Sequence, residues 1–248
     1  MLIPAHKFVR CGCLGVALTA CGLGSAAAAP ANGVAGVIEL FTSQGCSSCP
    51  PADRLLTKIA HDPSMLALSF PISYWDFIGW KDTLALPEFT VRQKAYAAAL
   101  GERRVYTPEA IIDGLVDAVG SDKAAIERAI KTAKQRMGAL SVPVQLHEQG
   151  GVLQIDIGAG NKTPAGVYVL RVAKSRTVVI ERGENSGHSV TYTNVVRAIH
   201  KVGEWDGKPE SLKLTELKGD DEAYVVLVQQ GSQDNPGAIL AAAKGVGL

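Results

Sequence analysis

The sequence predicts an α+β protein in which an α/β region is followed by a small, antiparallel, β-rich region of sandwich-like character. Three observations predict this fold class. An apolar run, a helical pattern and a second apolar run succeed one another between residues 36 and 73, which indicates a parallel strand pair with a right-handed crossover. A hairpin signal then leads into a further helical pattern. From Ser141 onward, short β-rich runs alternate with turn residues.

The first two strands, 36–41 and 65–73, flank a helix that begins near Cys49. Two prolines follow this cysteine, and the first turn of a helix tolerates them because its N–H groups have no helical partner. An aromatic loop, 74–85, leads to a second helix that begins near Pro87. Apolar side chains recur there at helical spacing: Phe89, Tyr96 and Leu100.

The pair Asp113-Gly114 separates two apolar runs. Such a pair is a strong hairpin signal, because type I′ turns need positive φ. The return strand of the hairpin is Leu115–Val119. Ser121 is the expected N-cap of a third helix that extends to Met137.

The sequence changes character at Ser141. Seven β-rich runs follow, a number typical of a small sandwich or open barrel. They are 142–147, 152–157, 166–173, 176–182, 189–202, 211–215 and 223–229. We therefore expect an α/β domain over residues 36–140 and a β-rich domain over residues 141–248.

Residues 1–29 have the layout of a secretory signal peptide, with basic residues, then an apolar run, then small residues. Leu18-Thr19-Ala20-Cys21 resembles a bacterial lipobox, which would make Cys21 a lipid-modified N-terminus. Ala26-Ala27-Ala28 fits an ordinary cleavage site, which would release a soluble protein. Residues 30–35 are the expected linker. Both alternatives predict a periplasmic or secreted protein in an oxidising compartment, tethered to the membrane only if Cys21 is lipidated.

The composition is ordinary for a globular protein, with 47% hydrophobic residues, 20% charged residues and a net charge of +1. No basic stripe with interleaved aromatic residues occurs, so nucleic acid is not an expected partner. Of the five cysteines, only Cys46 and Cys49 lie beyond the leader. A disulfide between them closes so small a loop that it restrains the unfolded chain little. The pair is therefore expected to serve chemistry rather than stability.

The motif Cys46-Ser47-Ser48-Cys49 follows an apolar strand and precedes a helix, an arrangement typical of a redox centre. Unpaired backbone N–H groups and the helix dipole favour a thiolate at this place. Cys46 would attack the disulfide of a protein or of a small thiol, and Cys49 would resolve the mixed disulfide. This predicts a thiol–disulfide oxidoreductase that uses no dissociable cofactor and depends on an unknown redox partner.

Two alternatives stay open for the cysteine pair. One is an inert disulfide in a non-enzymatic binding or assembly module. The other is a copper-handling protein, because thiolates suit Cu(I), although no second Cys-x-x-Cys and no His ligand spacing occurs. A solvent-exposed Cys46 sulfur would favour the oxidoreductase, whereas a sulfur sealed under the aromatic loop would favour the module.

Over residues 36–138, the order of elements, the Cys-x-x-Cys motif and Thr107-Pro108 resemble the thioredoxin fold. The resemblance implies that Pro108 is cis and lies beside the cysteines, and that Thr107 offers backbone groups to a bound substrate. It also implies a proton-relaying acid on the first strand, for which Glu39 is the candidate. An outward-facing or ion-paired glutamate is the alternative. The Ser-Ser dipeptide between the cysteines departs from ordinary thioredoxins, so their redox potential does not carry over.

More narrowly, the mature chain resembles the DUF1223 family of bacterial secreted proteins. The matching segments are residues 39–53, 74–76, 79–80, 106–108, 182–185 and 192–197. This resemblance implies a thioredoxin-like domain with a β-rich partner, and it implies no known reaction.

Several other polar and aromatic residues have more than one interpretation. Trp75 and Trp80 either form a substrate platform that roofs the site or pack against the body of the protein. Asp53, in the first helical turn, is expected to interact with the helix dipole rather than to act in catalysis. Gln44 is expected to help form the turn before Cys46. The loop 183–187 is either a ligand-binding loop or a tight β-turn.

Overall fold

The computed structural model describes residue 1 and residues 34–136, 138–215 and 218–248. Apart from residue 1, the predicted signal peptide lies outside the described residues, as do both candidate cleavage sites, Cys21 and most of the expected linker. Among the described residues, no helix is long and apolar enough to cross a membrane.

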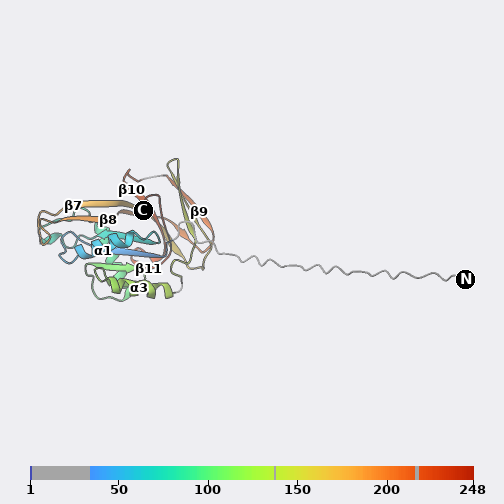
Figure 1. The fold of residues 1–248 in the computed structure, drawn as a ribbon, viewed down its shortest axis with the longest axis horizontal. Helices are drawn as coiled ribbons and strands as arrows, with labels where there is room; N and C mark the ends of the chain where they lie inside the picture. Colours follow the sequence, from blue (N-terminus) through green and yellow to red (C-terminus); the bar gives the residue numbers. More distant parts are fainter. Residues whose placement is uncertain (2–33, 137, 216–217) are drawn as a thin grey trace.

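The elements follow the expected order through the first half of the chain and then continue as strands (Figure 1). The helical elements are α1 (Pro50–Ala60), the 3₁₀ turn η1 (Asp76–Ile78), α2 (Pro87–Leu100) and α3 (Lys123–Gln135). The strands of the first half are β1 (Gly36–Thr42), β2 (Met65–Pro71), β3 (Glu109–Ile112) and β4 (Val116–Val119). Those of the second half are β5 (Val144–Gln149), β6 (Val152–Ile157), β7 (Ala165–Val179), β8 (Ser189–Trp205), β9 (Glu210–Thr215), β10 (Glu222–Ser232) and β11 (Asn235–Lys244).

Eight of these strands form one mixed sheet in the order β11-β10-β7-β8-β2-β1-β3-β4. The pair β1–β2 is parallel, as the strand–helix–strand pattern predicted, and β1–β3 is antiparallel. The two halves of the chain join at β2 and β8. There the Ser69 hydroxyl donates to the Thr193 carbonyl over 2.8 Å, and the Asn194 amide donates to the Ala67 carbonyl over 2.9 Å.

The β-rich region expected after residue 140 does not form its sheets from its own strands alone. Only β5, β6 and β9 form a second sheet, whereas β7, β8, β10 and β11 extend the sheet of the first half. Local patterning locates strands but does not say which distant strand each one pairs with. The change at Ser141 therefore marks the end of the helical segments and no break in the main sheet.

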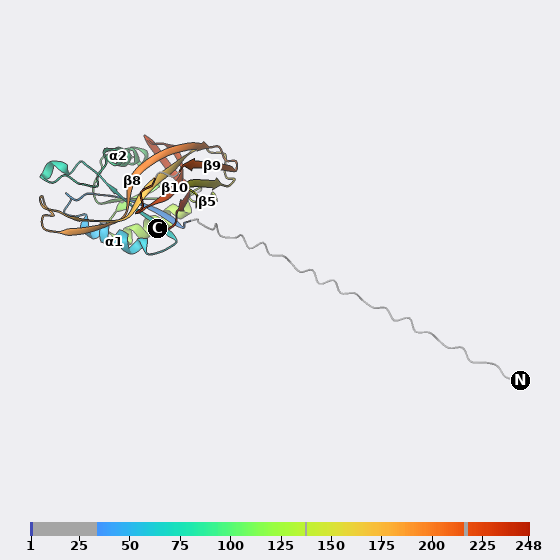
Figure 2. The same ribbon diagram turned by 90° about the horizontal axis from the view of Figure 1, so that it is seen from above.

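The two faces of the main sheet are covered differently, and β1 shows why because its side chains alternate. Val37 and Phe41 belong to the core that contains Phe89 and Tyr96 of α2. Ile38, like Leu40, belongs to the core under α1 and α3. Figure 2 shows α2 and α1 on opposite sides of the strands. Glu39 has the parity of Val37, which directs it toward α2.

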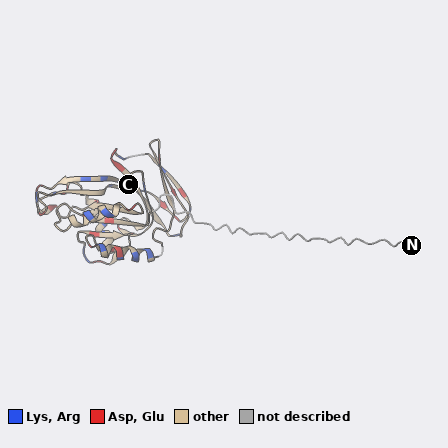
Figure 3. Ribbon diagram, viewed as in Figure 1, with Lys and Arg blue, Asp and Glu red and all other residues tan. Residues whose placement is uncertain are grey.

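The small sheet covers the rest of the α1 and α3 face. Val167 and Val169 of β7 pack with β5 and β6 around Trp205. Their neighbours Tyr168 and Leu170 belong to the core on the α2 side. Basic and acidic residues are interspersed in the view of Figure 3, for example along α3.

Several element boundaries correct the sequence predictions. The sequence predicted two runs, 166–173 and 176–182, with a turn at Lys174-Ser175 between them. This turn is wrong, because β7 is one continuous strand there. β11 was not predicted at all. Asp122, and not Ser121, caps α3, because its side chain accepts from the Ala125 N–H.

The Asp113-Gly114 hairpin turn is confirmed. These two residues have φ values of 51° and 72°, as a type I′ turn requires. A Cβ at Gly114 would lie 2.3 Å from the Gly237 carbonyl oxygen, so only glycine lets β11 approach this turn.

Candidate functional site: a covered disulfide between β1 and α1

Cys46 and Cys49 form a disulfide in the loop that connects β1 to α1. Cys49 is the N-cap of α1, and its carbonyl accepts from the Ala52 N–H and the Asp53 N–H. The Cys46 N–H donates to the Ser43 carbonyl, which makes the preceding turn. The predicted strand, cysteine pair and helix are therefore present in the predicted order.

The oxidoreductase interpretation expected a solvent-exposed Cys46, and this expectation is wrong. Cys46 is 1% exposed and Cys49 is fully buried, whereas Ser47 and Ser48 between them are exposed. Local sequence patterns do not say how closely distant loops cover a turn. Two loops do so: residues 74–85 and residues 181–188.

The aromatic loop 74–85 is bonded to the surroundings of the disulfide through its two indoles. The Trp75 Nε1–H donates to Thr107 Oγ1 and the Trp80 Nε1–H donates to Gln44 Oε1, each over 2.7 Å. A Cβ at Gly45 would lie 3.1 Å from the Trp75 Cβ, so this glycine lets the loop lie close. Phe77 stacks on Trp75 and is 81% exposed. Both tryptophans are thus partly buried, and an aromatic surface stays open beside them.

Thr107 and Pro108 lie beside the cysteine pair. Their peptide bond is cis, as expected. The Ser48 hydroxyl lies 3.4 Å from Cys46 Sγ and donates to the Thr107 carbonyl over 3.4 Å. The Gly120 N–H donates to the Pro108 carbonyl over 2.9 Å. The structure therefore brings together Cys46, Cys49, Thr107, Pro108 and Trp75.

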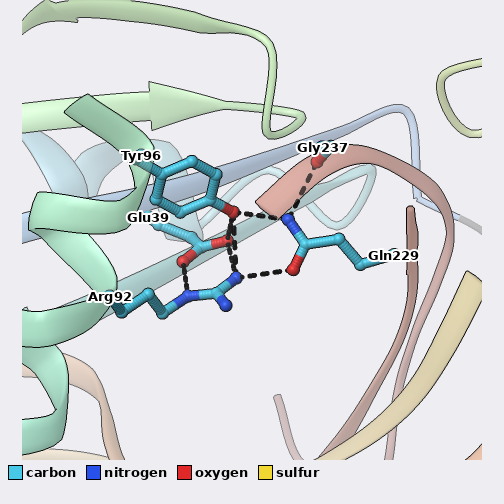
Figure 4. Close-up of polar contacts among 5 residues, drawn as sticks. All are labelled: Glu39, Arg92, Tyr96, Gln229 and Gly237. Atoms are coloured by element: carbon cyan, nitrogen blue, oxygen red, sulfur yellow. Dashed lines mark hydrogen bonds and ion pairs between the residues drawn. The ribbon is translucent and has the colours of Figure 1, made fainter. Parts of the chain in front are cut away.

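Glu39 is not free to relay protons, because both of its carboxylate oxygens are engaged on the α2 side of the sheet (Figure 4). Arg92 donates from Nε to Oε2 over 2.6 Å and from Nη2 to Oε1 over 2.8 Å. The Tyr96 hydroxyl also donates to Oε1. Gln229 of β10 bonds both Arg92 and Tyr96. The ion-paired alternative is the one that the structure contains, and the pair links the two halves of the chain.

Asp53, which the sequence analysis assigned to the helix dipole, is a buried acid next to the cysteine pair. It lies one helical turn after Cys49, on the same face of α1. It is 2% exposed, and its Oδ1 accepts from the Thr42 hydroxyl over 2.8 Å. Its Oδ2 has no hydrogen-bond partner among the described residues. Burial raises the pKa of Asp53 to about 7, although the Thr42 hydrogen bond lowers it. The available signal was its position beside Ala52 and Leu56 on the apolar face.

Asp82 is a second buried acid beside this loop. Its Oδ2 accepts from the Gln44 N–H over 2.8 Å, and its Oδ1 accepts from the Leu84 N–H over 2.8 Å. Burial raises the pKa of Asp82 to about 6, against the lowering effect of these backbone bonds. The negative charges of Asp53 and Asp82 raise the pKa of the buried Tyr192, whose burial is the larger cause. Two acids that titrate near neutral pH thus flank the turn that carries Cys46.

The loop 181–188 reaches the same turn from the second half of the chain. Its Asn185 Nδ2 donates to the Gln44 carbonyl and to the Cys46 carbonyl, each over 2.9 Å. Gln44 therefore contacts both covering loops, because its side chain holds Trp80 and its carbonyl holds Asn185. The loop is a tight turn, which was one of its two sequence interpretations.

The next question is whether the described residues include a cluster of metal-ligating side chains. Among the residues that the structure describes, no three His, Cys, Asp or Glu side chains cluster closely enough to hold a metal ion.

These features define a mixed α/β protein with a Cys-x-x-Cys disulfide between its first strand and its first helix. The chain belongs to the family described as "Protein of unknown function (DUF1223)", which matches residues 37–229. This confirms the family that the motifs indicated.

Two solved structures are similar to the chain over most of its length. Protein AGR_C_4864 from Agrobacterium tumefaciens is 38% identical with a TM-score of 0.79, and the match covers 87% of this chain and 96% of that one. HBP35 of Porphyromonas gingivalis is 14% identical with a TM-score of 0.60, and the match covers 86% of this chain and 74% of that one. The second likeness concerns the fold alone. No curated protein matches the chain.

Proposed function

We propose that this protein is an extracytoplasmic thiol–disulfide oxidoreductase whose redox centre is Cys46 and Cys49. The observation that carries the proposal is the disulfide itself, placed at the start of α1 with the buried acid Asp53 one turn further on. A disulfide that closes so short a loop adds little to stability. Its position beside a group that titrates near neutral pH suits proton-coupled exchange.

The proposed reaction transfers the disulfide to two substrate thiols. A substrate thiolate attacks Cys46 Sγ, the Cys46–Cys49 bond breaks, and Cys49 leaves as a thiolate that takes a proton. A second substrate thiolate then attacks the substrate sulfur of the mixed disulfide and releases Cys46. The substrate pair is oxidised to a disulfide, and the protein is reduced to a dithiol. In the reverse direction, Cys46 attacks a substrate disulfide and Cys49 resolves the intermediate.

In this proposal Asp53, and not Glu39, is the proton-relaying acid that the resemblance to the thioredoxin fold implies. Glu39 is bonded to Arg92 and Tyr96, whereas Asp53 has a free carboxylate oxygen on the face of α1 that carries Cys49. Because the pKa of Asp53 is raised to about 7, its carboxyl is partly protonated at neutral pH. In this proposal it gives a proton to the departing Cys49 thiolate and takes one back in the reverse direction.

The substrate class of this proposal is a protein or small-molecule thiol. Thr107 and the open aromatic surface of Trp75 and Phe77 would contact it, since they lie beside the exposed Ser48. The thioredoxin-like nature of the first half and the periplasmic or secreted location are parts of the same proposal. They are supported by the order of β1, the cysteine pair and α1, and by the signal-like leader. Lipid anchoring through Cys21 is proposed only for cleavage at the lipobox, Leu18-Thr19-Ala20-Cys21.

A second candidate function is a non-enzymatic module with an inert disulfide. The observation that favours it is the burial of both cysteines, since Cys46 is 1% exposed and Cys49 is fully buried. Under the oxidoreductase proposal, the covering loops must open before exchange. Under the module hypothesis, they stay closed, and the exposed aromatic surface serves contact alone.

Trapping of mixed disulfides separates the two functions. A Cys49→Ala variant of the full chain, expressed in the periplasm of a bacterial host, should accumulate mixed disulfides at Cys46 because the resolving thiol is gone. Non-reducing electrophoresis and mass spectrometry should detect adducts that dithiothreitol releases.

The matched control is the Cys46→Ala, Cys49→Ala double variant, which should form no adducts. Absence of adducts from the single variant, together with no exchange between the wild-type pair and glutathione, would favour the inert module.

A further inference from the structure

The loop 181–188 has only one buried residue. Asn185 is 4% exposed, whereas the other residues of the loop are exposed. Its side-chain amide hydrogen-bonds outside its own loop, because Nδ2 donates to the carbonyls of Gln44 and Cys46. Among the described residues, Asn185 is the side chain of the second half that hydrogen-bonds the disulfide turn, and it makes two hydrogen bonds there.

The rest of the loop is bonded to itself. The Gly187 N–H donates to the Ile180 carbonyl over 2.8 Å, and the Ile180 N–H donates to the His188 carbonyl over 2.9 Å. The Ser186 hydroxyl donates to the Glu181 carbonyl over 2.8 Å. These bonds do not depend on the cysteine turn. The loop therefore has the internal connections of a unit that keeps its shape when it separates from that turn.

Contacts with the aromatic loop place the loop 181–188 at the edge of the covered site. A Cβ at Gly183 would lie 3.4 Å from the Trp80 Cβ and 3.6 Å from the Ile78 carbonyl oxygen. The two covering loops thus meet beside the turn that carries Cys46, which is 1% exposed although Ser47 and Ser48 next to it are exposed.

We propose that residues 181–188 form a lid over the disulfide and that Asn185 is its latch. This inference rests on the proposed function, because it names the regulation of the same site. In the closed state the two hydrogen bonds of Asn185 hold the lid against Cys46. Their release opens the lid as a unit and exposes the sulfur to a thiolate. Substrates that compete for the carbonyls of Gln44 and Cys46 would open it.

The reduction rate of the disulfide in the folded full chain tests the latch. Wild type and Asn185→Ala are incubated with excess tris(2-carboxyethyl)phosphine at pH 7, quenched with N-ethylmaleimide and weighed by mass spectrometry. Loss of two net hydrogen bonds should accelerate reduction by roughly 10- to 100-fold. Asn185→Asp keeps the size of the side chain but faces both carbonyls with a carboxylate, so it should accelerate reduction at least as much.

Ser186→Ala is the matched control, because it removes one side-chain hydrogen bond from the same loop without touching the cysteine turn. Its reduction rate should stay within about twofold of wild type. Urea unfolding of the oxidised proteins measures the free energy of unfolding, and a lower value in a variant would reveal a general loss of stability. Faster reduction with an unchanged free energy of unfolding supports the latch.

Two results would overturn the latch: unchanged reduction in both Asn185 variants, or acceleration no larger than the loss of global stability explains. The reagent reports access to sulfur and not biological exchange. Failure of the latch therefore leaves the proposed function standing, and failure of the trapping experiment leaves the latch standing.

Discussion

Replacing Arg92 with methionine should lower the free energy of unfolding by about 3–5 kcal/mol, because it leaves the Glu39 carboxylate buried without its cation. Glu39 is fully buried, and Arg92 supplies two of its three hydrogen bonds. Arg92 also bonds Gln229 of β10, so the substitution weakens the contact between the two halves of the chain. Urea unfolding at pH 7 measures the loss.

Two further variants show whether the buried charge causes this loss. The Glu39→Met, Arg92→Met double variant should be more stable than Arg92→Met alone, because no unpaired charge remains in the core. Lys123→Met breaks the exposed pair with Glu127 on α3 and should cost less than about 0.5 kcal/mol. Equal losses in Arg92→Met and Lys123→Met would contradict the interpretation of Glu39 as a buried structural ion pair.

The protein should become more stable as the pH falls from 8 to 5, and Asp53 should account for much of the gain. Burial raises the pKa of Asp53 from 3.8 to about 7. Between these two values the folded state binds the proton more tightly than the unfolded state does. The stabilisation is therefore complete below the unfolded pKa and is lost as the pH rises through about 7. For one such group the change from pH 8 to pH 5 is about 2–3 kcal/mol.

Asp53→Asn should flatten this dependence, because asparagine still accepts from the Thr42 hydroxyl but carries no charge. The variant should be more stable than wild type at pH 8, with the difference shrinking toward pH 5. Asp82, whose pKa is raised to about 6, and Glu109, whose pKa burial raises to about 7, add a residual slope of the same sign. Asp234→Asn, at an exposed turn, is the control and should leave the slope intact. An Asp53→Asn variant with the wild-type pH profile would show that Asp53 does not titrate as proposed.

Much of the first half could be predicted because its signals are local. The Asp113-Gly114 turn and the proline-started helices depend on residues next to one another. The alternation in β1 also explains the environment of Glu39, once α2 is known to cover that face. Its partner Arg92 was not predicted, because it lies 53 residues away in the chain.

The second half was harder because its strands pair over long distances. β11 contains the run Leu240-Ala241-Ala242-Ala243, and alanine has a low intrinsic preference for strands. Its burial between β10 and the neighbouring layers overrides that preference. At Lys174-Ser175 the polar pair resembled a turn, yet both residues lie in a strand that pairs with β8.

The sequence predicted most residues of the candidate site, but it did not predict that Cys46 is buried. Cys46, Cys49, Thr107, Pro108 and Trp75 lie together, as the motif order suggested. The turn that carries Cys46 is bonded by Asn185, which is 139 residues away in the chain, and no local pattern links the two residues. Asp53 was assigned to the helix dipole because it is an acid in a first helical turn, and its burial appears only once α1 is packed in the fold.

The midpoint reduction potential of the Cys46–Cys49 couple tests most directly whether this disulfide exchanges with substrates or is inert. The folded protein is equilibrated in glutathione and dithiothreitol buffers, and the fraction reduced is read by alkylation and mass spectrometry. An oxidoreductase should have a midpoint between about −270 and −120 mV, the range of known exchange proteins. A midpoint below about −300 mV, as in structural disulfides, would contradict the proposed function.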